Sequence, residues 1–152
     1  MPMPWTYRHS EREFKAFLAD VKDRTGLSSD NMAYTAVDGV LQVFRKRLTP
    51  AEGIAFADIL PSTLRAIFVA GWDITAAPAP WADRATLTAE AKALRRNHNL
   101  TPDDILAATA WALRRSLRQA DLDRVLARIG PEAQDFWRLD GVDPADLEQR
   151  IV

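Results

Sequence analysis

Apolar residues recur at helical spacing along almost the whole chain, and this periodicity constrains the fold more than any other feature. Such spacing places apolar side chains on one face of an α-helix, whereas the strict alternation typical of a strand is rare here. The longest stripe consists of Ala33, Ala36, Val37, Val40, Leu41, Phe44 and Leu48. The sequence therefore predicts an all-α protein, a single bundle of about eight or nine helices.

Capping residues divide this pattern into separate helices. Thr49-Pro50-Ala51-Glu52 has the form of a capping box with proline at the first helical position. Thr101-Pro102 and Asp143-Pro144 repeat the arrangement of a cap followed by proline, and Gly26 suits the end of a helix. We expect helices near residues 10–25, 30–47, 50–60, 62–70, 83–97, 102–118, 120–129, 131–139 and 144–150.

The second half of the chain echoes the first. A shift of 73 residues places Phe14 on Leu87 without a gap, and a shift of 69 places Phe68 on Trp137. The ungapped match crosses a helix break, which favours a true repeat over a chance alignment of two amphipathic stretches. We expect a single domain at 1–152, with a first helical repeat at 10–72, a linker at 73–82, a second helical repeat at 83–141 and a C-terminal helix at 142–152.

Composition excludes several classes of protein. The chain has 20 basic and 21 acidic residues, and both halves are balanced, so no bulk charge attracts it to nucleic acid or to an anionic membrane. It has no cysteine, which excludes disulfides and thiol nucleophiles. Its longest apolar run, Ala66 to Trp72, is far shorter than the ~20 residues that span a bilayer. The N-terminal residues lack the pattern of a secretory signal. We expect a cytoplasmic protein with no membrane partner.

The segment from Arg47 to Pro78 has the most distinctive residue order. Its marked positions are Arg47-Leu48-Thr49, Glu52, Ala57, Leu60-Pro61, Leu64-Arg65, Gly71-Trp72-Asp73 and Pro78. This order closely resembles a bacterial family catalogued as domain of unknown function 2267, in which RLT-x-x-E precedes LP-x-x-x-R and then GW with a proline after it. The resemblance is strongest over residues 14–78, and it implies a fold of two weakly similar helical halves.

The second half departs from the family pattern at two places. Leu87 stands where the family usually has an aromatic residue, and Ile129-Gly130-Pro131 stands where it usually has a second Leu-Pro. The resemblance implies no activity, because the family has no assigned one.

Known catalytic patterns are absent from the sequence. His9 and His98 stand alone, outside the spacings of metal-binding histidines. There is no glycine-rich phosphate loop and no Gly-x-Ser-x-Gly elbow. We therefore expect no catalytic residue, no metal and no cofactor, and we favour a protein that is not an enzyme.

Arg65, Trp72 and Trp81 form the candidate interaction surface. Arg65 follows Leu60-Pro61 on a short predicted helix, and the two tryptophans flank the linker. Tryptophan and arginine dominate the binding energy of protein interfaces. The alternative is an internal role, with Trp72 packing the linker down and Arg65 binding the carbonyls at a helix end.

A candidate basic patch comprises Arg45, Lys46, Arg114, Arg115 and Arg118. The shift of 73 places Arg45 on Arg118, so two clusters occupy matching repeat positions, and Arg95-Arg96 forms a further cluster. These cations suit phosphate or an acidic partner. Alternatively, each cluster ends a helix, where cations offset the helix dipole.

Three functions fit these observations. We expect first a non-enzymatic helical interaction module with an unidentified protein partner. A second hypothesis is binding of nucleic acid or a phosphate ligand through the matched arginine clusters. A third is binding of a small molecule at the seam between the two halves. The sequence leaves the oligomeric state open.

Overall fold

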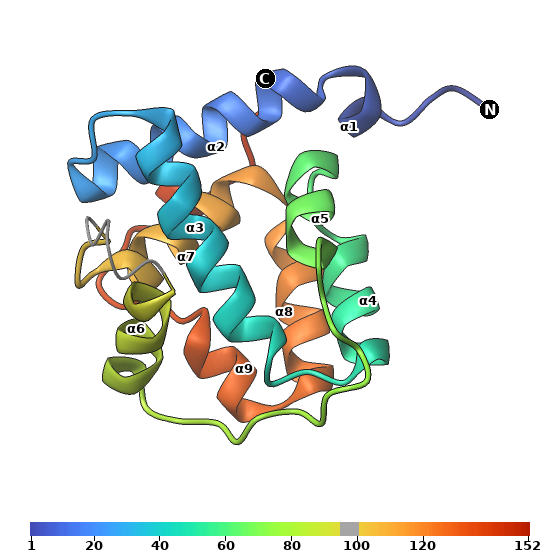
Figure 1. Cartoon of the computed structure of the whole chain (residues 1–152). Helices are drawn as coiled ribbons and strands as arrows, with labels where there is room; N and C mark the ends of the chain where they lie inside the picture. Colours follow the sequence, from blue (N-terminus) through green and yellow to red (C-terminus); the bar gives the residue numbers. More distant parts are fainter. Residues whose placement is uncertain (95–100) are drawn as a thin grey trace.

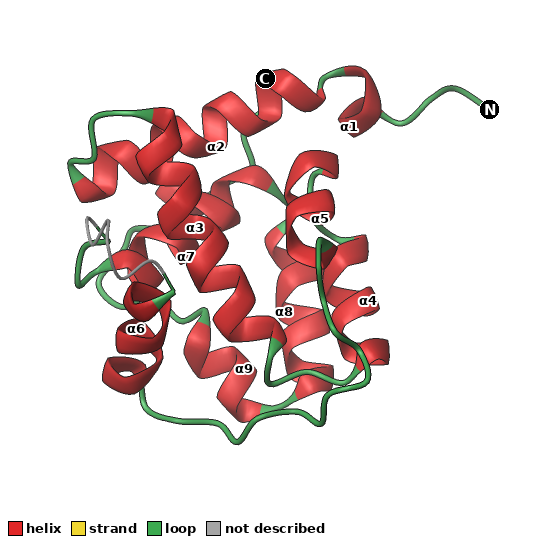
Figure 2. Ribbon diagram, in the orientation of Figure 1, coloured by secondary structure: helices red, strands yellow, loops and turns green. Residues whose placement is uncertain are grey.

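The computed structural model describes residues 1–94 and 101–152, and within these ranges the chain forms helices and no strand (Figures 1 and 2). This confirms the predicted all-α bundle. The elements are α1 (Trp5–Arg8), α2 (Ser10–Thr25), α3 (Asp30–Arg45), α4 (Pro50–Asp58), α5 (Ser62–Val69), α6 (Arg84–Ala93), α7 (Ile105–Ser116), α8 (Gln119–Ile129), α9 (Pro131–Phe136) and the 3₁₀ helix η1 (Pro144–Leu147).

Local side-chain and backbone chemistry sets some of the helix ends, whereas α7 begins at Ile105, after the expected cap at Thr101-Pro102, and has no side-chain cap. The Thr49 hydroxyl accepts a hydrogen bond from the Glu52 backbone N–H, and the Glu52 carboxylate accepts one from the Thr49 N–H, so the predicted capping box is present. Gly26 ends α2 with φ of 77°, a left-handed conformation that costs glycine little. The helix expected over 144–150 is the shorter 3₁₀ helix η1. Helix α1 was not predicted, because its four residues carry no apolar stripe and no capping side chain.

Part of the predicted pattern lies outside the described residues. His98, the pair Arg95-Arg96 and the end of the helix expected over 83–97 all fall within residues 95–100.

Helix α3 lies at the centre of the bundle, packed against α2, α5, α6 and α7 (Figure 1). At its C-terminal end an aromatic cluster fills the core, with Phe44 centred 4.8 Å from Phe56 and 4.9 Å from Phe136. Phe68 and Trp137 complete this fully buried cluster. Because its rings come from α3, α4, α5 and the α9 region, the cluster joins the early and late helices of the chain.

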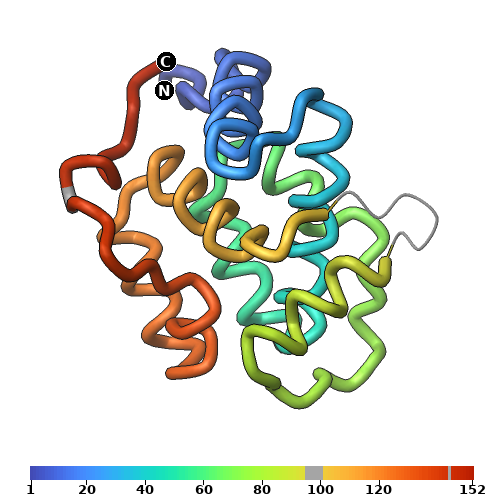
Figure 3. The backbone as a smooth tube through the Cα atoms, turned by 90° about the vertical axis from the view of Figure 1, so that its left-hand side faces the viewer, coloured from blue at the N-terminus to red at the C-terminus, as the bar shows by residue number. Residues whose placement is uncertain are grey.

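The C-terminal segment returns to α2 and α7 (Figure 3). The Arg150 guanidinium contacts the Asp20 carboxylate, and Arg115 Nε of α7 lies 3.2 Å from the same group. Asp20 is 2% exposed, and burial raises its pKa although Arg150 and Arg115 act in the opposite direction. These three side chains therefore tie α2, α7 and the tail together.

Of the helices in the described ranges, none combines the length and the apolar character needed to cross a bilayer.

Candidate functional site

Arg65 closes the C-terminal end of α4. Its Nε donates to the Ala57 carbonyl over 3.0 Å, and its Nη2 donates to the carbonyls of Asp58 and Leu60 over 3.1 and 3.2 Å. The last carbonyls of a helix have no partner within the helix, so the guanidinium supplies the donors that they lack. Nη1 also donates to the Tyr7 hydroxyl, which brings α1 against this corner.

Trp72 packs its ring against α4. Gly71 precedes it with φ of 67°, and this left-handed turn directs the chain back across the bundle. A Cβ atom on Gly53 would lie 2.0 Å from Cη2 of the Trp72 ring, so the close approach requires glycine at position 53. Trp72 is half-buried and also contacts Phe68, with 5.9 Å between ring centroids.

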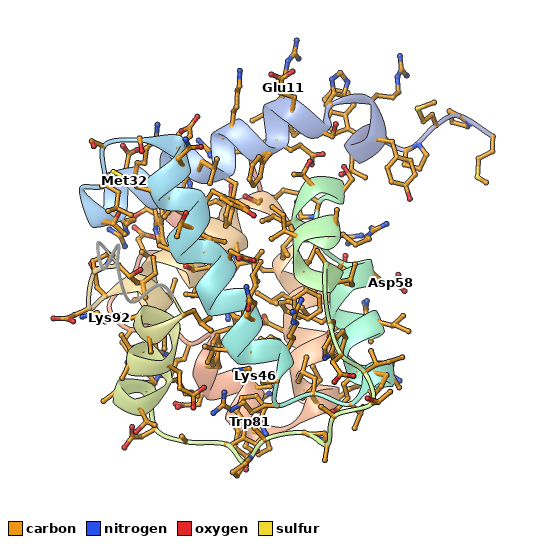
Figure 4. The ribbon with its side chains drawn as sticks, viewed as in Figure 1. Glu11, Met32, Lys46, Asp58, Trp81 and Lys92 are labelled. Atoms are coloured by element: carbon orange, nitrogen blue, oxygen red, sulfur yellow. The ribbon has the colours of Figure 1, made fainter. Side chains whose placement is uncertain are left out.

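Trp81 lies at the other end of the linker, below the last turn of α3 (Figure 4). Its ring centroid is 6.0 Å from that of Phe44, and it is half-buried against the core. Arg65, Trp72 and Trp81 thus take part in three different packing arrangements, on α4, on Gly53 and on Phe44.

Three consecutive cations end α3, and each has different surroundings. Arg45 is 8% exposed and its Nη1 donates to the carbonyls of Phe68 and Ala70, over 2.9 and 2.8 Å. Lys46 is exposed (Figure 4). Arg47 is 6% exposed, and its two terminal nitrogens each lie 2.6 Å from an oxygen of Glu90 on α6.

The other predicted cations lie in the second half of the chain. Arg114 donates from Nε and Nη2 to the Trp137 carbonyl over 3.3 and 3.2 Å, and Arg115 binds Asp20. The Arg115 guanidinium also lies 4.7 Å from the centre of the Trp111 ring. Arg118 is exposed at the N-cap of α8. The structure therefore turns Arg45, Arg114 and Arg115 inward and leaves Lys46 and Arg118 exposed.

A hollow of about 380 Å³ opens between the end of α3 and the linker. We call it the α3–linker hollow. It brings together Arg45 and Lys46 of the predicted basic patch and Trp72 of the predicted interaction surface. Its lining residues are Gln42, Arg45, Lys46, Leu48, Gly71, Trp72, Asp73, Ala76, Ala77 and Ala79.

Backbone and side-chain bonds hold the linker in place along this hollow. The Ala79 N–H donates to the Lys46 carbonyl over 2.8 Å, and Arg47 Nε donates to the Pro80 carbonyl over 3.2 Å. Asp73 accepts from the backbone N–H and the hydroxyl of Thr75, and these hydrogen bonds lower the pKa of the Asp73 carboxyl. The wall of the hollow is thus fixed at both ends.

A second hollow, of about 420 Å³, lies among α2, α6, α7 and residues 138–142. Arg24, Arg84 and Arg138 line it together with Asp104 and Asp140. Arg84 donates to three carbonyls at the end of α9, Arg138 pairs with Asp140, and Arg24 lies over the Trp111 ring. Its lining lacks a large aromatic residue, so it is the weaker candidate for a binding site.

No group of three or more metal-ligating side chains converges in the described parts of the chain. The histidine that these parts contain, His9, stacks on Trp5 with 3.8 Å between ring centroids. Chemically, the α3–linker hollow offers cations, an aromatic face and small apolar side chains. This arrangement is suited to binding and offers no nucleophile paired with a base.

Sequence reasoning missed Gly53, Glu90 and Asp20. Each acts through a residue distant in the chain, namely Trp72, Arg47 and Arg115. No local spacing in the sequence marks such pairs.

Comparison with known protein families matches residues 14–136 to the family described as uncharacterized conserved protein (DUF2267). No curated protein matches the chain.

Proposed function

Because the chain belongs to the DUF2267 family, whose description assigns no activity, we propose from its structure that it is a non-enzymatic interaction module. In this proposal a segment of a partner protein binds in the α3–linker hollow. The observation that carries the proposal is the meeting of Arg45, Lys46 and Trp72 in one hollow. Arginine and tryptophan at a concave site are typical of residues that dominate binding energy.

The size and lining of the hollow support a peptide segment as the ligand. About 380 Å³ lies near the lower end of the ~300–1,000 Å³ range of ligand pockets, which suits one or two side chains. Leu48 and three alanines give apolar contact, while Lys46 stands exposed at the margin.

Binding of nucleic acid through the matched arginine clusters is less well supported. Arg114 and Arg115 are held by Trp137 and Asp20, and Arg45 is held by carbonyls of α5. A phosphate backbone needs several exposed cations along one face.

To test the proposal, peptides that bind the wild-type protein are selected from a library of random linear peptides. Affinities of the selected peptides are then measured for Ala76→Trp, which fills the hollow, and for Ile54→Trp, a control on α4 where the native side chain is 62% exposed. We expect Ala76→Trp to abolish binding and Ile54→Trp to retain it. Equal binding to both variants, or no peptide selected at all, would contradict the proposal.

We further propose that the chain arose by duplication of a bacterial four-helix unit. In support, the shift of 73 carries Ser10, the first residue of α2, to Asp83, next to the first residue of α6. The shift of 69 carries Ser62 of α5 to Pro131, the first residue of α9. Superposition of α2–α5 on α6–α9 tests this proposal, and different chain paths would refute it.

A further inference from the structure

Arg45 carries a buried positive charge that no described carboxylate neutralises. It is 8% exposed, and within the described ranges no Asp or Glu lies at ion-pair distance from it. Residues 95–100 contain no acidic residue that would change this. A buried charge is costly unless a partner of opposite sign accompanies it.

The carbonyls that Arg45 binds compensate only part of this charge. Its Nη1 donates two hydrogen bonds, to the carbonyls of Phe68 and Ala70 at the C-terminal end of α5. The C-terminus of a helix is equivalent to about half a negative charge, and that charge is spread over several carbonyls. Arg45 lines the α3–linker hollow, so an anion that enters the hollow lies close to its positive charge.

The other buried charges of the protein show what is missing at Arg45. Arg47 is paired with Glu90 through two nitrogens, and Asp20 contacts both Arg115 and Arg150. Burial lowers the pKa of Arg45, and the more distant Asp38 raises it by a smaller amount. Arg45 thus lacks the direct partner that Arg47 and Asp20 each have.

The remaining charges of the hollow do not cancel this surplus. Lys46 adds a second positive charge at the margin. Asp73, the one carboxylate in the lining, is occupied by the N–H and hydroxyl of Thr75. The lining of Arg45, Lys46 and Asp73 therefore has a net charge of about +1, and this charge attracts an anion.

We propose that the α3–linker hollow binds the carboxylate of an acidic side chain on the partner protein. Arg45 and Lys46 pair with this carboxylate, and an apolar neighbour of the acidic residue packs on Trp72 and Leu48. The identity of the ligand as a partner peptide rests on the proposed function, whereas the preference for a carboxylate rests on the charges of the hollow.

The first experiment uses the peptides selected on the wild-type protein. Each acidic residue is replaced by its amide, Asp→Asn or Glu→Gln, and affinity is measured by calorimetry. A charge-assisted hydrogen bond predicts that one replacement weakens binding about tenfold. The proposed preference for a carboxylate would be overturned by peptides that bind in the hollow without an acidic residue, or whose affinity is unchanged by every replacement.

The second experiment needs no peptide. Ala77 lines the hollow, so Ala77→Asp supplies a carboxylate there and Ala77→Asn supplies the uncharged match. We expect the NMR-measured pKa of the new carboxyl to lie at least about one pH unit below its ordinary value near 3.9. A pKa at or above that value would overturn the inference.

The two experiments separate the two proposals. A lowered pKa without any peptide binding would refute the interaction module and leave the anion site standing. Peptide binding without acidic preference, together with an ordinary pKa, would refute the anion site and leave the module standing. If inorganic phosphate saturates the hollow at concentrations at which acetate does not, phosphate replaces carboxylate as the preferred ligand.

Discussion

Arg45 and Arg47 lie two residues apart at the end of α3, yet the regions that receive their side chains differ. On the α6 side, Arg47 meets both oxygens of Glu90 and is 6% exposed. On the linker side, Arg45 is 8% exposed, and within the described residues its hydrogen bonds end on the carbonyls of Phe68 and Ala70. Burial of a cation therefore serves two purposes in this protein. The ion pair between Arg47 and Glu90 holds the end of α3 against α6. Arg45 has no described carboxylate partner and remains available to an external anion.

The largest effect is expected at the closed pair. Arg47→Met leaves Glu90 without its partner and removes the bond to the Pro80 carbonyl. Breaking a buried pair costs about 3–5 kcal/mol, and we expect a value toward the low end because Glu90 is partly exposed. Chemical denaturation measures the loss. A loss below about 1 kcal/mol would show that the pair does not hold the two helices together.

The wall of the hollow depends on the close approach of Trp72 to Gly53. Gly53→Ala places a Cβ atom inside the Trp72 ring, and we expect a loss of about 1–3 kcal/mol, although alanine is the better helix former. Thermal unfolding measures the change. In a Trp72→Leu background the same substitution should cost much less. Equal costs in the two backgrounds would show that the ring does not set the requirement for glycine.

Arg45→Met should cost less than Arg47→Met. The variant loses two hydrogen bonds to carbonyls, about 1–2 kcal/mol together, but it also removes a buried charge that has no carboxylate partner. The same denaturation experiment compares the two variants directly. If Arg45→Met lowers the free energy of unfolding more than Arg47→Met does, Arg45 contributes more to stability than Arg47, and the comparison between the two arginines is reversed.

The pH dependence of stability distinguishes the carboxylates of Glu90 and Asp20 by its sign. Arg47 hydrogen bonds lower the pKa of Glu90, so its contribution to stability is present above the ordinary pKa and is lost as pH falls through the folded pKa. Burial raises the pKa of Asp20, so its contribution is present below the ordinary pKa and is lost as pH rises through the folded pKa.

Substitution of each carboxylate tests this difference. Glu90→Gln should flatten the rise in the free energy of unfolding on going from acid toward neutral pH, and Asp20→Asn should steepen it. Denaturation at a series of acidic and neutral pH values measures both slopes. A change of the same sign in the two variants would contradict the assignment.

Local patterns in the sequence predicted most of the helices of the fold. The stripe from Ala33 to Leu48 predicted α3, and the Thr49 to Glu52 box predicted the start of α4, because both depend on residues within one or two helical turns. Helix α1 escaped prediction because it is held by tertiary bonds, in which the N–H and the hydroxyl of Ser62 donate to Thr6.

The candidate site was predictable only in part. The residue types of Lys46 and Trp72 mark both as candidates, and the sequence places Trp72 beside the predicted linker and Lys46 at the end of a predicted helix. That they share a hollow with Arg45 depends on the path of residues 71–79 across the end of α3, which local spacing does not fix. The partner of Arg47, Glu90, lies 43 residues away, so the contrast between the two arginines is a property of the tertiary fold.

Arg45 leaves unmatched positive charge in the α3–linker hollow. A double-mutant cycle tests this with Ala77→Asp and Ala77→Asn, each made with and without Arg45→Met, and measures the free energy of unfolding at neutral pH. We expect aspartate to be more stabilising than asparagine by about 1 kcal/mol, and most of this difference to disappear with Arg45→Met. No advantage of aspartate, or an advantage that persists without Arg45, would show that Arg45 does not supply unmatched charge to the hollow.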